Sequence, residues 1–426
     1  MRYLHILTLT LFCLLIIAGG TAAAQNTVVV VPLGMAKQLG NIVTVAKQGG
    51  DYTDPVQALA GITDSGQDNP YVMIIGPGVY SLSRSLALKP YVSLIGFGPE
   101  TTVLERRDPA GSSRASRSII DLNGAKSAQI TGLTLRLVEP DGAAAAVYAD
   151  KKASLELGNV TIQVTARNST ADIKGVYWNC EGSLVLSRVD LEAEARSGDL
   201  FDISGASADA RLEFVYTTGS VSVQQMGTDP LTGFRIGSHV EGLAADVGLF
   251  AIQGARGIYA SGLTRPFAVQ GGYIRIAEGG TSVAVASSGA NFVMRDTFIL
   301  AEGGASAQCT GFQIDSSSPV LENIHARLQC GNSNTVLRIG ASSSPAISHV
   351  VALATGGGPS NIALDIADSS ASPQVMHSSL QGDIAVDGIT SGTRISETKL
   401  QGTVNDNDAN TQCLDTYDQD LAAVNC

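Results

Sequence analysis

Residues that could bind a metal ion are concentrated near the C-terminus. Asp406, Asp408 and Asn410 alternate in the way that opens a calcium-binding loop, whose oxygen ligands stand at positions one, three and five. The pattern then ends, because Thr411 replaces the glycine at position six and Tyr417 replaces the glutamate at position twelve. We therefore expect this segment to be an acidic cap, with calcium binding as the alternative.

Three histidines, His325, His349 and His377, lie near equivalent positions of similar segments. Their offsets differ, since His325 follows an aliphatic residue of its segment whereas His349 precedes one. A stacked metal-binding ladder would need closer equivalence and further His or Cys ligands. We expect turn or solvent-facing histidines, and the sequence indicates no cofactor.

Five cysteines follow the N-terminal hydrophobic segment, and an exported protein is expected to use them in disulfides. Cys309 and Cys330 are 21 residues apart, about one repeat of the pattern given below, so that stacking could bring them into bonding range. Cys413 and Cys426 would close a 13-residue loop. We predict these two disulfides, which leave Cys180 buried and reduced.

The elements that must position these residues come from a repeat of about 20 to 29 residues. In each segment an aliphatic residue is followed by others three and five positions later. Short alternating runs, such as Gly233–Ile236 and Gly311–Ile314, lie between these triplets, so each repeat carries at least two strands. The period predicts a solenoid of stacked coils. Clear triplets are Ile130, Leu133 and Leu135; Leu157, Val160 and Ile162; Leu186, Val189 and Leu191.

The turns of this repeat are rich in serine. A serine cluster and a proline precede the same strand in the segments that begin at Ile314, Ile339 and Ile366. Serines at equivalent turns of neighbouring coils can form a hydrogen-bonded ladder, whereas a nucleophilic serine would need a base at fixed reach. We predict a structural role for them. Glycine and serine also interrupt every helical stripe, so helices are nearly excluded.

The composition excludes some partners. Charged residues make up 15% of the chain and its net charge is −12, or −13 once Arg2 is removed with the export signal described next. Nucleic acids and bare anionic membranes would repel such a protein, so neither is expected to bind it.

The first residues have the features of an export signal. Arg2 precedes an apolar run from Leu4 to Ala18, and small residues up to Ala24 supply a cleavage site. The run of about 15 residues is shorter than the ~20 that span a bilayer, and no later segment is apolar enough to do so. We expect cleavage after Ala24 and export to the periplasm, the cell surface or the medium.

The segments Val43–Ile62 and Tyr71–Leu104 resemble the opening of the pectin-lyase-like superfamily, in particular of the pectinesterases. The matching parts are an entry strand with a valine-alanine-lysine sequence, a short helix expected at about Pro55 to Gly61, and the strand-end motif Pro77 to Tyr80. The resemblance implies an all-β, right-handed parallel β-helix with an N-terminal capping helix. It specifies no activity, because this fold carries many functions.

The residues that perform the chemistry in pectinesterases are not recognisable at most positions. Leu82 occupies the place of a family glutamate, and the nearest echoes of the catalytic aspartate motifs are Asp296, preceded by Arg295, and Asp202. The resemblance therefore makes Asp202, Asp296 and Arg295 weakly matched catalytic candidates. Turn or solvent-facing positions are the alternative interpretation.

These observations predict four regions: a signal peptide at 1–24, an extension at 25–42, a β-helix domain at 43–404 and an acidic, cysteine-closed tail at 405–426. We expect a non-catalytic protein that binds an extracellular polysaccharide or cell-surface glycan, or that has a structural or adhesive role. The alternative is a divergent carbohydrate-active enzyme. An enzyme should gather two or more carboxylates and a base in one groove, whereas a binding rod should present aromatic or amide stripes.

Overall fold

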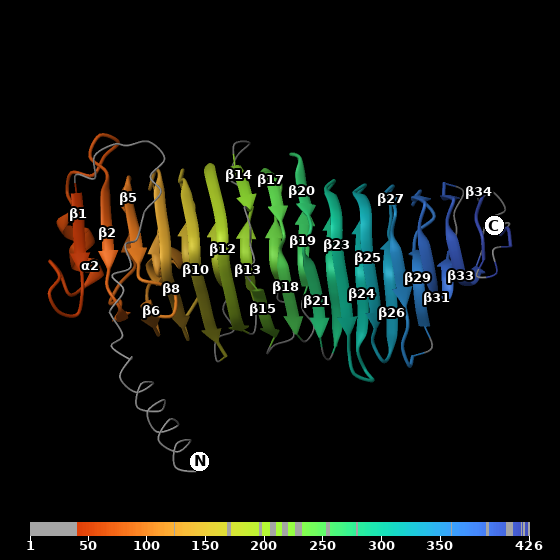
Figure 1. Ribbon diagram of the computed structural model, residues 1–426, viewed down its shortest axis with the longest axis horizontal. Coiled ribbons are helices and arrows are strands. Elements are labelled where there is room, and N and C mark those ends of the chain that lie inside the picture. The colour runs from red at the N-terminus through yellow and green to blue at the C-terminus, as the bar shows by residue number, and fades with distance from the viewer. Residues whose placement is uncertain are drawn as a thin grey trace, which may run out of the picture. The chain divides into compact units, whose positions relative to one another are not determined.

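The computed structural model describes residues 41–424, apart from 123, 168–171, 196–197, 205–209, 215–219, 226–231, 253–255, 278–279, 359, 389–391, 406–411, 419 and 421. The described chain is a right-handed parallel β-helix of about 11 turns, as the sequence predicts. Figure 1 shows the coils stacked side by side from β1 at one end to β34 at the other.

Each coil contributes strands to three faces of the helix, and the strands of successive coils pair in parallel register. Long strands bend at a corner and belong to two faces, so that β8, β10, β12, β23 and β25 run from the first face into the second. The strands that begin on the first face are β1 (Asn41–Val45), β2 (Tyr71–Ile75), β5 (Val92–Gly96), β8 (Ala128–Val138), β10 (Leu155–Ala166), β12 (Gly182–Ala195), β14 (Ala210–Phe214), β17 (Val240–Ala245), β20 (Phe267–Gln270), β23 (Val293–Glu302), β25 (Val320–Gln329), β27 (Ala346–Ser348), β30 (Gln374–Met376), β32 (Arg394–Ser396) and β34 (Gln412–Leu414).

The other two faces are built from shorter strands. The second face is completed by β3 (Gly78–Ser81), β6 (Thr102–Arg107), β15 (Ser220–Gln225), β18 (Gly248–Ile252), β21 (Tyr273–Ala277), β28 (Val351–Ala354), β31 (Ser379–Asp387) and β33 (Lys399–Asn405). The third face consists of β4 (Leu86–Ala87), β7 (Ile120–Asp121), β9 (Ala144–Ala149), β11 (Ile173–Trp178), β13 (Gly198–Ile203), β16 (Thr232–Ile236), β19 (Arg256–Ser261), β22 (Thr281–Ser288), β24 (Gln308–Asp315), β26 (Ser333–Ile339) and β29 (Ser360–Ile366), with the ends of β31 and β33.

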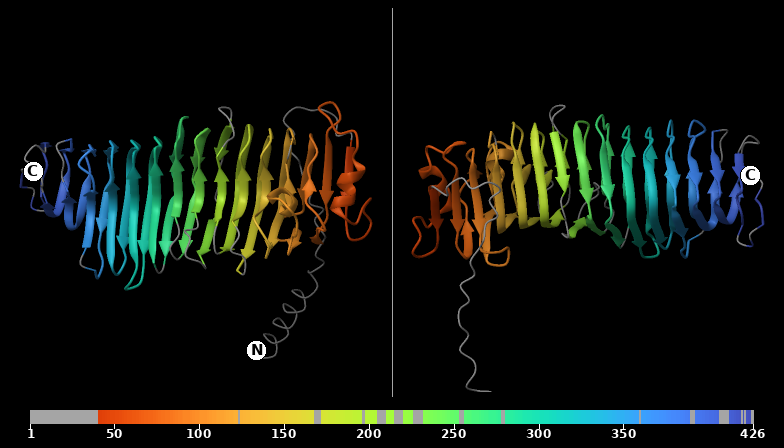
Figure 2. Two further views of the ribbon diagram at one scale, coloured as in Figure 1. Left: turned by 180° about the vertical axis from the view of Figure 1, so that it is seen from behind. Right: turned by 45° about the horizontal axis from the view of Figure 1, so that its top comes forward.

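The first coil is covered by the helix that the sequence predicts. Helix α2 (Pro55–Gly61) begins after Asp54, whose side chain accepts a hydrogen bond from the Val56 N–H at 2.8 Å. Its apolar residues Val56 and Leu59 are buried against the core. Both views in Figure 2 place this helix at the end of the solenoid next to β1, where it caps the core.

The core consists of aliphatic and aromatic side chains stacked at equivalent positions of successive coils. Phe201 on β13 and Phe234 on β16 lie in register, and their rings stack with centroids 4.5 Å apart. Phe312 occupies the same column on β24 and is fully buried. Parallel stacking therefore places like residues on like residues, which is why the sequence repeats.

Serines and asparagines satisfy backbone groups between coils. The Ala290 N–H donates to Ser317 Oγ at 3.0 Å, and the Ser317 N–H donates to Ser343 Oγ at 3.3 Å. Ser317 and Ser343 are both buried. The predicted structural role of these turn serines is confirmed.

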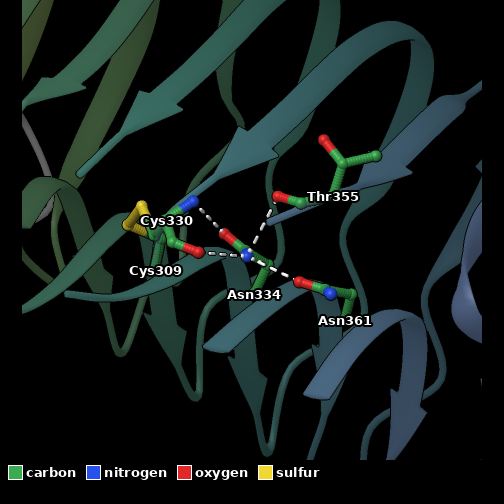
Figure 3. Close-up of a disulfide and its surroundings, with 5 residues drawn as sticks. All are labelled: Cys309, Cys330, Asn334, Thr355 and Asn361. Carbon is green, nitrogen blue, oxygen red and sulfur yellow. Dashed lines mark hydrogen bonds between the residues drawn. A yellow bond between two sulfur atoms is a disulfide. The ribbon is translucent and has the colours of Figure 1, made fainter. Parts of the chain in front are cut away.

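The predicted disulfide between Cys309 and Cys330 is present and links the start of β24 to the residue that directly follows β25. Figure 3 shows Asn334 next to it: its side-chain oxygen accepts from the Cys330 N–H, and its amide donates to the Cys330 carbonyl and to Asn361. The disulfide thus lies next to a buried ladder of the asparagines Asn334 and Asn361.

We expect the double substitution Cys309→Ser and Cys330→Ser to lower the free energy of unfolding by about 3 kcal/mol, because the disulfide removes loop-closure entropy from the unfolded chain. The 21-residue separation sets this magnitude. Urea unfolding followed through the fluorescence of the single tryptophan, Trp178, measures the difference. A reduced wild-type protein as stable as the oxidised one would contradict the prediction.

The remaining cysteines divide as follows. Cys180 is a free, buried thiol, as predicted, and burial raises its pKa to about 12. Cys413 is in a disulfide, and Cys426, the partner predicted for it, lies outside the described residues.

Candidate binding face

The three catalytic candidates from the sequence lie on different parts of the solenoid. Asp202 is on β13 of the third face, whereas Arg295 and Asp296 are on β23 where it turns between the first and second faces. Asp296 has a φ of 53°, a left-handed conformation that aspartate tolerates, and accepts a hydrogen bond from Asn323 Nδ2 at 2.6 Å. Arg295 pairs with Glu322 at 2.8 Å.

Two of the histidines lie at the same corner of the solenoid as Asp296. His349 and His377 occupy this corner in later coils, also with left-handed φ, and their rings stack at 5.2 Å. His325 lies on a different column and stacks on Phe298. Within the described part of the chain, no three His, Cys, Asp or Glu residues are grouped to hold a metal ion. Asp406, Asp408 and Asn410 lie outside that part.

Asp202 belongs instead to a buried ionic cluster that sequence reasoning missed. Lys174 on β11 is 3% exposed, and its ammonium group donates a hydrogen bond to Asp199 and lies 3.1 Å from Asp202 and 3.0 Å from Asp172. Burial lowers the pKa of Lys174, but the attraction of these carboxylates outweighs it and raises the pKa overall. Asp199 and Asp202 are each 7% exposed.

A short insertion lies against this cluster. Helix α3 (Arg114–Arg117) contacts β9, and the Arg114 guanidinium pairs with Asp172 at 2.9 Å and lies over the Tyr177 ring. Burial raises the pKa of Asp172, but Lys174 and Arg114 outweigh it and lower the pKa overall. The cluster therefore consists of carboxylates paired with buried or half-buried cations.

The second face is hollowed near the N-terminal end of the solenoid. A groove of about 360 Å³ crosses β8, β10 and β12, and the β5–β6 loop at Pro99 and Glu100 also lines it. Its floor is polar: Arg136 Nε donates to Gln163 Oε1 at 2.9 Å, and Gln163 Nε2 donates to Glu192 at 3.2 Å. Each of these side chains comes from the next coil, so the groove presents one polar group per rung.

The same face carries an aromatic column farther along the axis. Tyr273, Phe298 and His325 lie in register on β21, β23 and β25. Phe298 is 55% exposed, and its ring stacks on that of His325 with centroids 5.2 Å apart. The register leads from this column to the groove, because Tyr273 pairs with Gly248 and Gly248 pairs with Ser220. Val221, directly after Ser220, pairs with Leu191, directly after Asp190 of the groove.

The second face thus combines an amide-containing groove with an exposed aromatic column along one line. We call the residues of these two features the lateral strip: Pro99, Glu100, Val103, Thr134, Arg136, Thr161, Gln163, Asp190, Glu192, Tyr273, Phe298 and His325. Alternation along the strands in principle identifies outward residues, but only the register between coils aligns them.

Known proteins resemble the chain in structure and not in sequence. No family model matches it, and no curated protein matches it. A pectin methylesterase from carrot is 13% identical and has a TM-score of 0.31, with 80% of this chain and 90% of the esterase covered. The mannuronan C-5 epimerase AlgE4 A-module of Azotobacter vinelandii is 13% identical, with a TM-score of 0.38 and coverage of 89% and 94%.

A third similar structure is PfbA, a surface adhesin of Streptococcus pneumoniae, at 10% identity and a TM-score of 0.28, with 87% of this chain and 92% of the adhesin covered. Likenesses of this size indicate no function for the chain. In the part of the chain that the structure describes, no helix is long and apolar enough to cross a membrane.

Proposed function

We propose that this protein is exported and that its lateral strip binds an extracellular polysaccharide or cell-surface glycan without chemical conversion. The observation that carries this proposal is the exposed stack of Phe298 and His325, aligned with the polar groove on one face. Covering a half-exposed apolar ring with a ligand contributes favourable binding free energy. A sugar ring can cover it while the hydroxyl groups of the sugar hydrogen-bond to polar neighbours.

The geometry of the solenoid suits a polymer that lies along its axis. Successive coils are about 4.8 Å apart, the spacing of paired strands. A polysaccharide on the lateral strip would therefore contact a new side chain at each coil, such as Arg136, Gln163 and Glu192 in turn. Amide and carboxylate groups can exchange their present hydrogen bonds for those of sugar hydroxyls at little net cost.

The charge of the strip restricts the ligand. Glu100, Asp190 and Glu192 line the groove with one cationic side chain, Arg136. This excess of carboxylates disfavours polyuronates such as pectate and alginate, and it favours neutral glycans. The net charge of the whole chain acts in the same direction.

A divergent carbohydrate-active enzyme is the second candidate, and the three carboxylates of the groove favour it. Glycoside hydrolysis uses a pair of carboxyl groups on either side of the scissile bond. Asp190 and Glu192 stand two residues apart on β12 and both line the groove. The residues that line the groove include no histidine, lysine or cysteine.

We expect Phe298→Ala to weaken binding to the best neutral glycan about tenfold, which corresponds to the loss of one aromatic contact. The ligand is first found with a glycan array, and its dissociation constant is then measured by calorimetry. Leu414→Ala is the matched control, since Leu414 is 67% exposed but lies on β34 of the first face. Equal affinity of both variants would contradict the binding site.

The same ligands decide between binding and catalysis. Release of reducing ends or unsaturated products above background, lost in Asp190→Asn or Glu192→Gln with the fold retained, would replace our proposal with the enzyme. Strong binding of pectate or alginate would contradict the charge argument. Binding without product release supports a non-catalytic role.

A further inference from the structure

We propose that Lys174 and Asp199 condense spontaneously to an amide bond that links β11 to β13 across two neighbouring coils. The proposal rests on the buried cluster of the third face and not on the lateral strip. It makes Lys174 the nucleophile, Asp199 the electrophile and Asp202 the group that transfers protons.

The two reacting groups are held together before any reaction. Lys174 and Asp199 are register partners on adjacent parallel strands, and the Lys174 ammonium donates a hydrogen bond to the Asp199 carboxylate. Both residues are more than nine-tenths buried, so few alternative side-chain conformations remain. Fixing a nucleophile and an electrophile in contact gives the high effective concentration that makes slow condensations proceed.

Asp202 is placed to move protons between them. Its Oδ2 lies 3.1 Å from Lys174 Nζ, and Asp202 follows Asp199 by three positions on the same strand. A carboxyl group within hydrogen-bond distance of the attacking nitrogen can accept a proton and return it to a leaving oxygen. Arg235 Nη1 lies 3.6 Å from Asp199 Oδ2 and can stabilise the negative charge that develops on that carboxyl group.

The condensation starts from the charged pair. A proton passes from Lys174 Nζ to the Asp199 carboxylate along their hydrogen bond, and this transfer replaces two charges with two neutral groups. The lone pair of Nζ then attacks Cγ of Asp199, and a C–N bond forms as the C=O π bond opens.

Asp202 completes the reaction. Its carboxylate takes a proton from the nitrogen and delivers it to the hydroxyl group on Cγ, which leaves as water while the C=O bond forms again. In total one ammonium and one carboxylate become one amide and one water. No oxidant is needed, and the net charge of the cluster does not change.

The product would be a covalent tie between coils in a part of the solenoid that the disulfide does not reach. Cys309 and Cys330 link neighbouring coils nearer the C-terminus, whereas Lys174 and Asp199 link neighbouring coils at β11 and β13. Unlike a disulfide, an amide persists in reducing conditions.

Mass spectrometry of the reduced, trypsin-digested full chain tests the proposal. Trypsin does not cleave after an acylated lysine, so we expect peptide 168–188 joined to peptide 197–211, with their summed mass less one water. Lys174→Arg keeps the charge but has no primary amine, and should give separate peptides. Lys152→Arg, in the exposed pair with Glu181, is the matched control and should keep the link.

Each outcome is decisive. Cleavage after Lys174 and a free 197–211 peptide in the folded wild-type protein would overturn the proposal. A branched peptide that persists in Lys174→Arg would place the link elsewhere and also overturn it. We expect Asp202→Asn to slow condensation at least about 100-fold, and a variant that condenses as fast as the wild type would refute the role of Asp202.

Discussion

Replacement of Lys174 by methionine is expected to lower the free energy of unfolding by about 3 to 5 kcal/mol. Methionine keeps most of the aliphatic stem but removes the charge that holds Asp199, Asp202 and Asp172 together. Carboxylates left in a buried site without their cation lose the attraction that offsets their desolvation. The expectation holds with or without the amide bond. The free ammonium group of Lys174 neutralises one negative charge of the cluster, and the amide bond would remove the charge of Asp199.

The measurement is urea unfolding followed by fluorescence, for which the chain is well suited. Its single tryptophan, Trp178, lies on the same strand as Lys174 and is buried. Lys152→Met is the control, because the side chains of Lys152 and Glu181 are 70% and 41% exposed and such pairs contribute less than about 1 kcal/mol. Similar losses in the two variants would show that the third-face cluster contributes no more than a surface pair.

Phe201→Ala is expected to lower the free energy of unfolding by a similar amount, about 3 to 5 kcal/mol. The ring of Phe201 is 1% exposed and stacks on Phe234 of the next coil. Truncation removes buried apolar surface and leaves a cavity, since the coils are hydrogen-bonded on both sides and cannot close around it.

Phe298→Ala provides the matched control for this second prediction, because it is the same change on an exposed ring. We expect it to alter stability by less than about 1 kcal/mol, although it should weaken glycan binding. Circular dichroism confirms that both variants retain the strand signal. A Phe201 variant as stable as the Phe298 variant would mean that the stacked rings do not form part of a continuous core.

Several features of this protein follow from local patterns in the sequence. The aliphatic triplets and their period predict parallel coils because each coil must bury its apolar residues against equivalent ones. The pairing of Cys309 with Cys330 follows from a separation of about one coil. The capping helix at Pro55–Gly61 follows from the resemblance of the N-terminal segment to known β-helices, and the structure has it at the same residues.

The sequence did not reveal the Lys174 cluster or the lateral strip. Lys174 and Asp199 are separated by 25 residues, and nothing in the local sequence distinguishes them from other charged residues of exposed strand positions. Phe298 and His325 are 27 positions apart in the sequence, so no local pattern indicates that their rings stack.

The difference has one physical cause. Hydrophobic periodicity determines which residues of a strand face the core, and this information is local. Which outward residues become neighbours depends on the register between coils, and coil lengths vary with each turn, so a shift of one residue would exchange the faces. The sequence alone therefore determined the solenoid, its capping helix and the disulfide between Cys309 and Cys330. The tertiary structure decided which charges are buried together and which side chains share one surface.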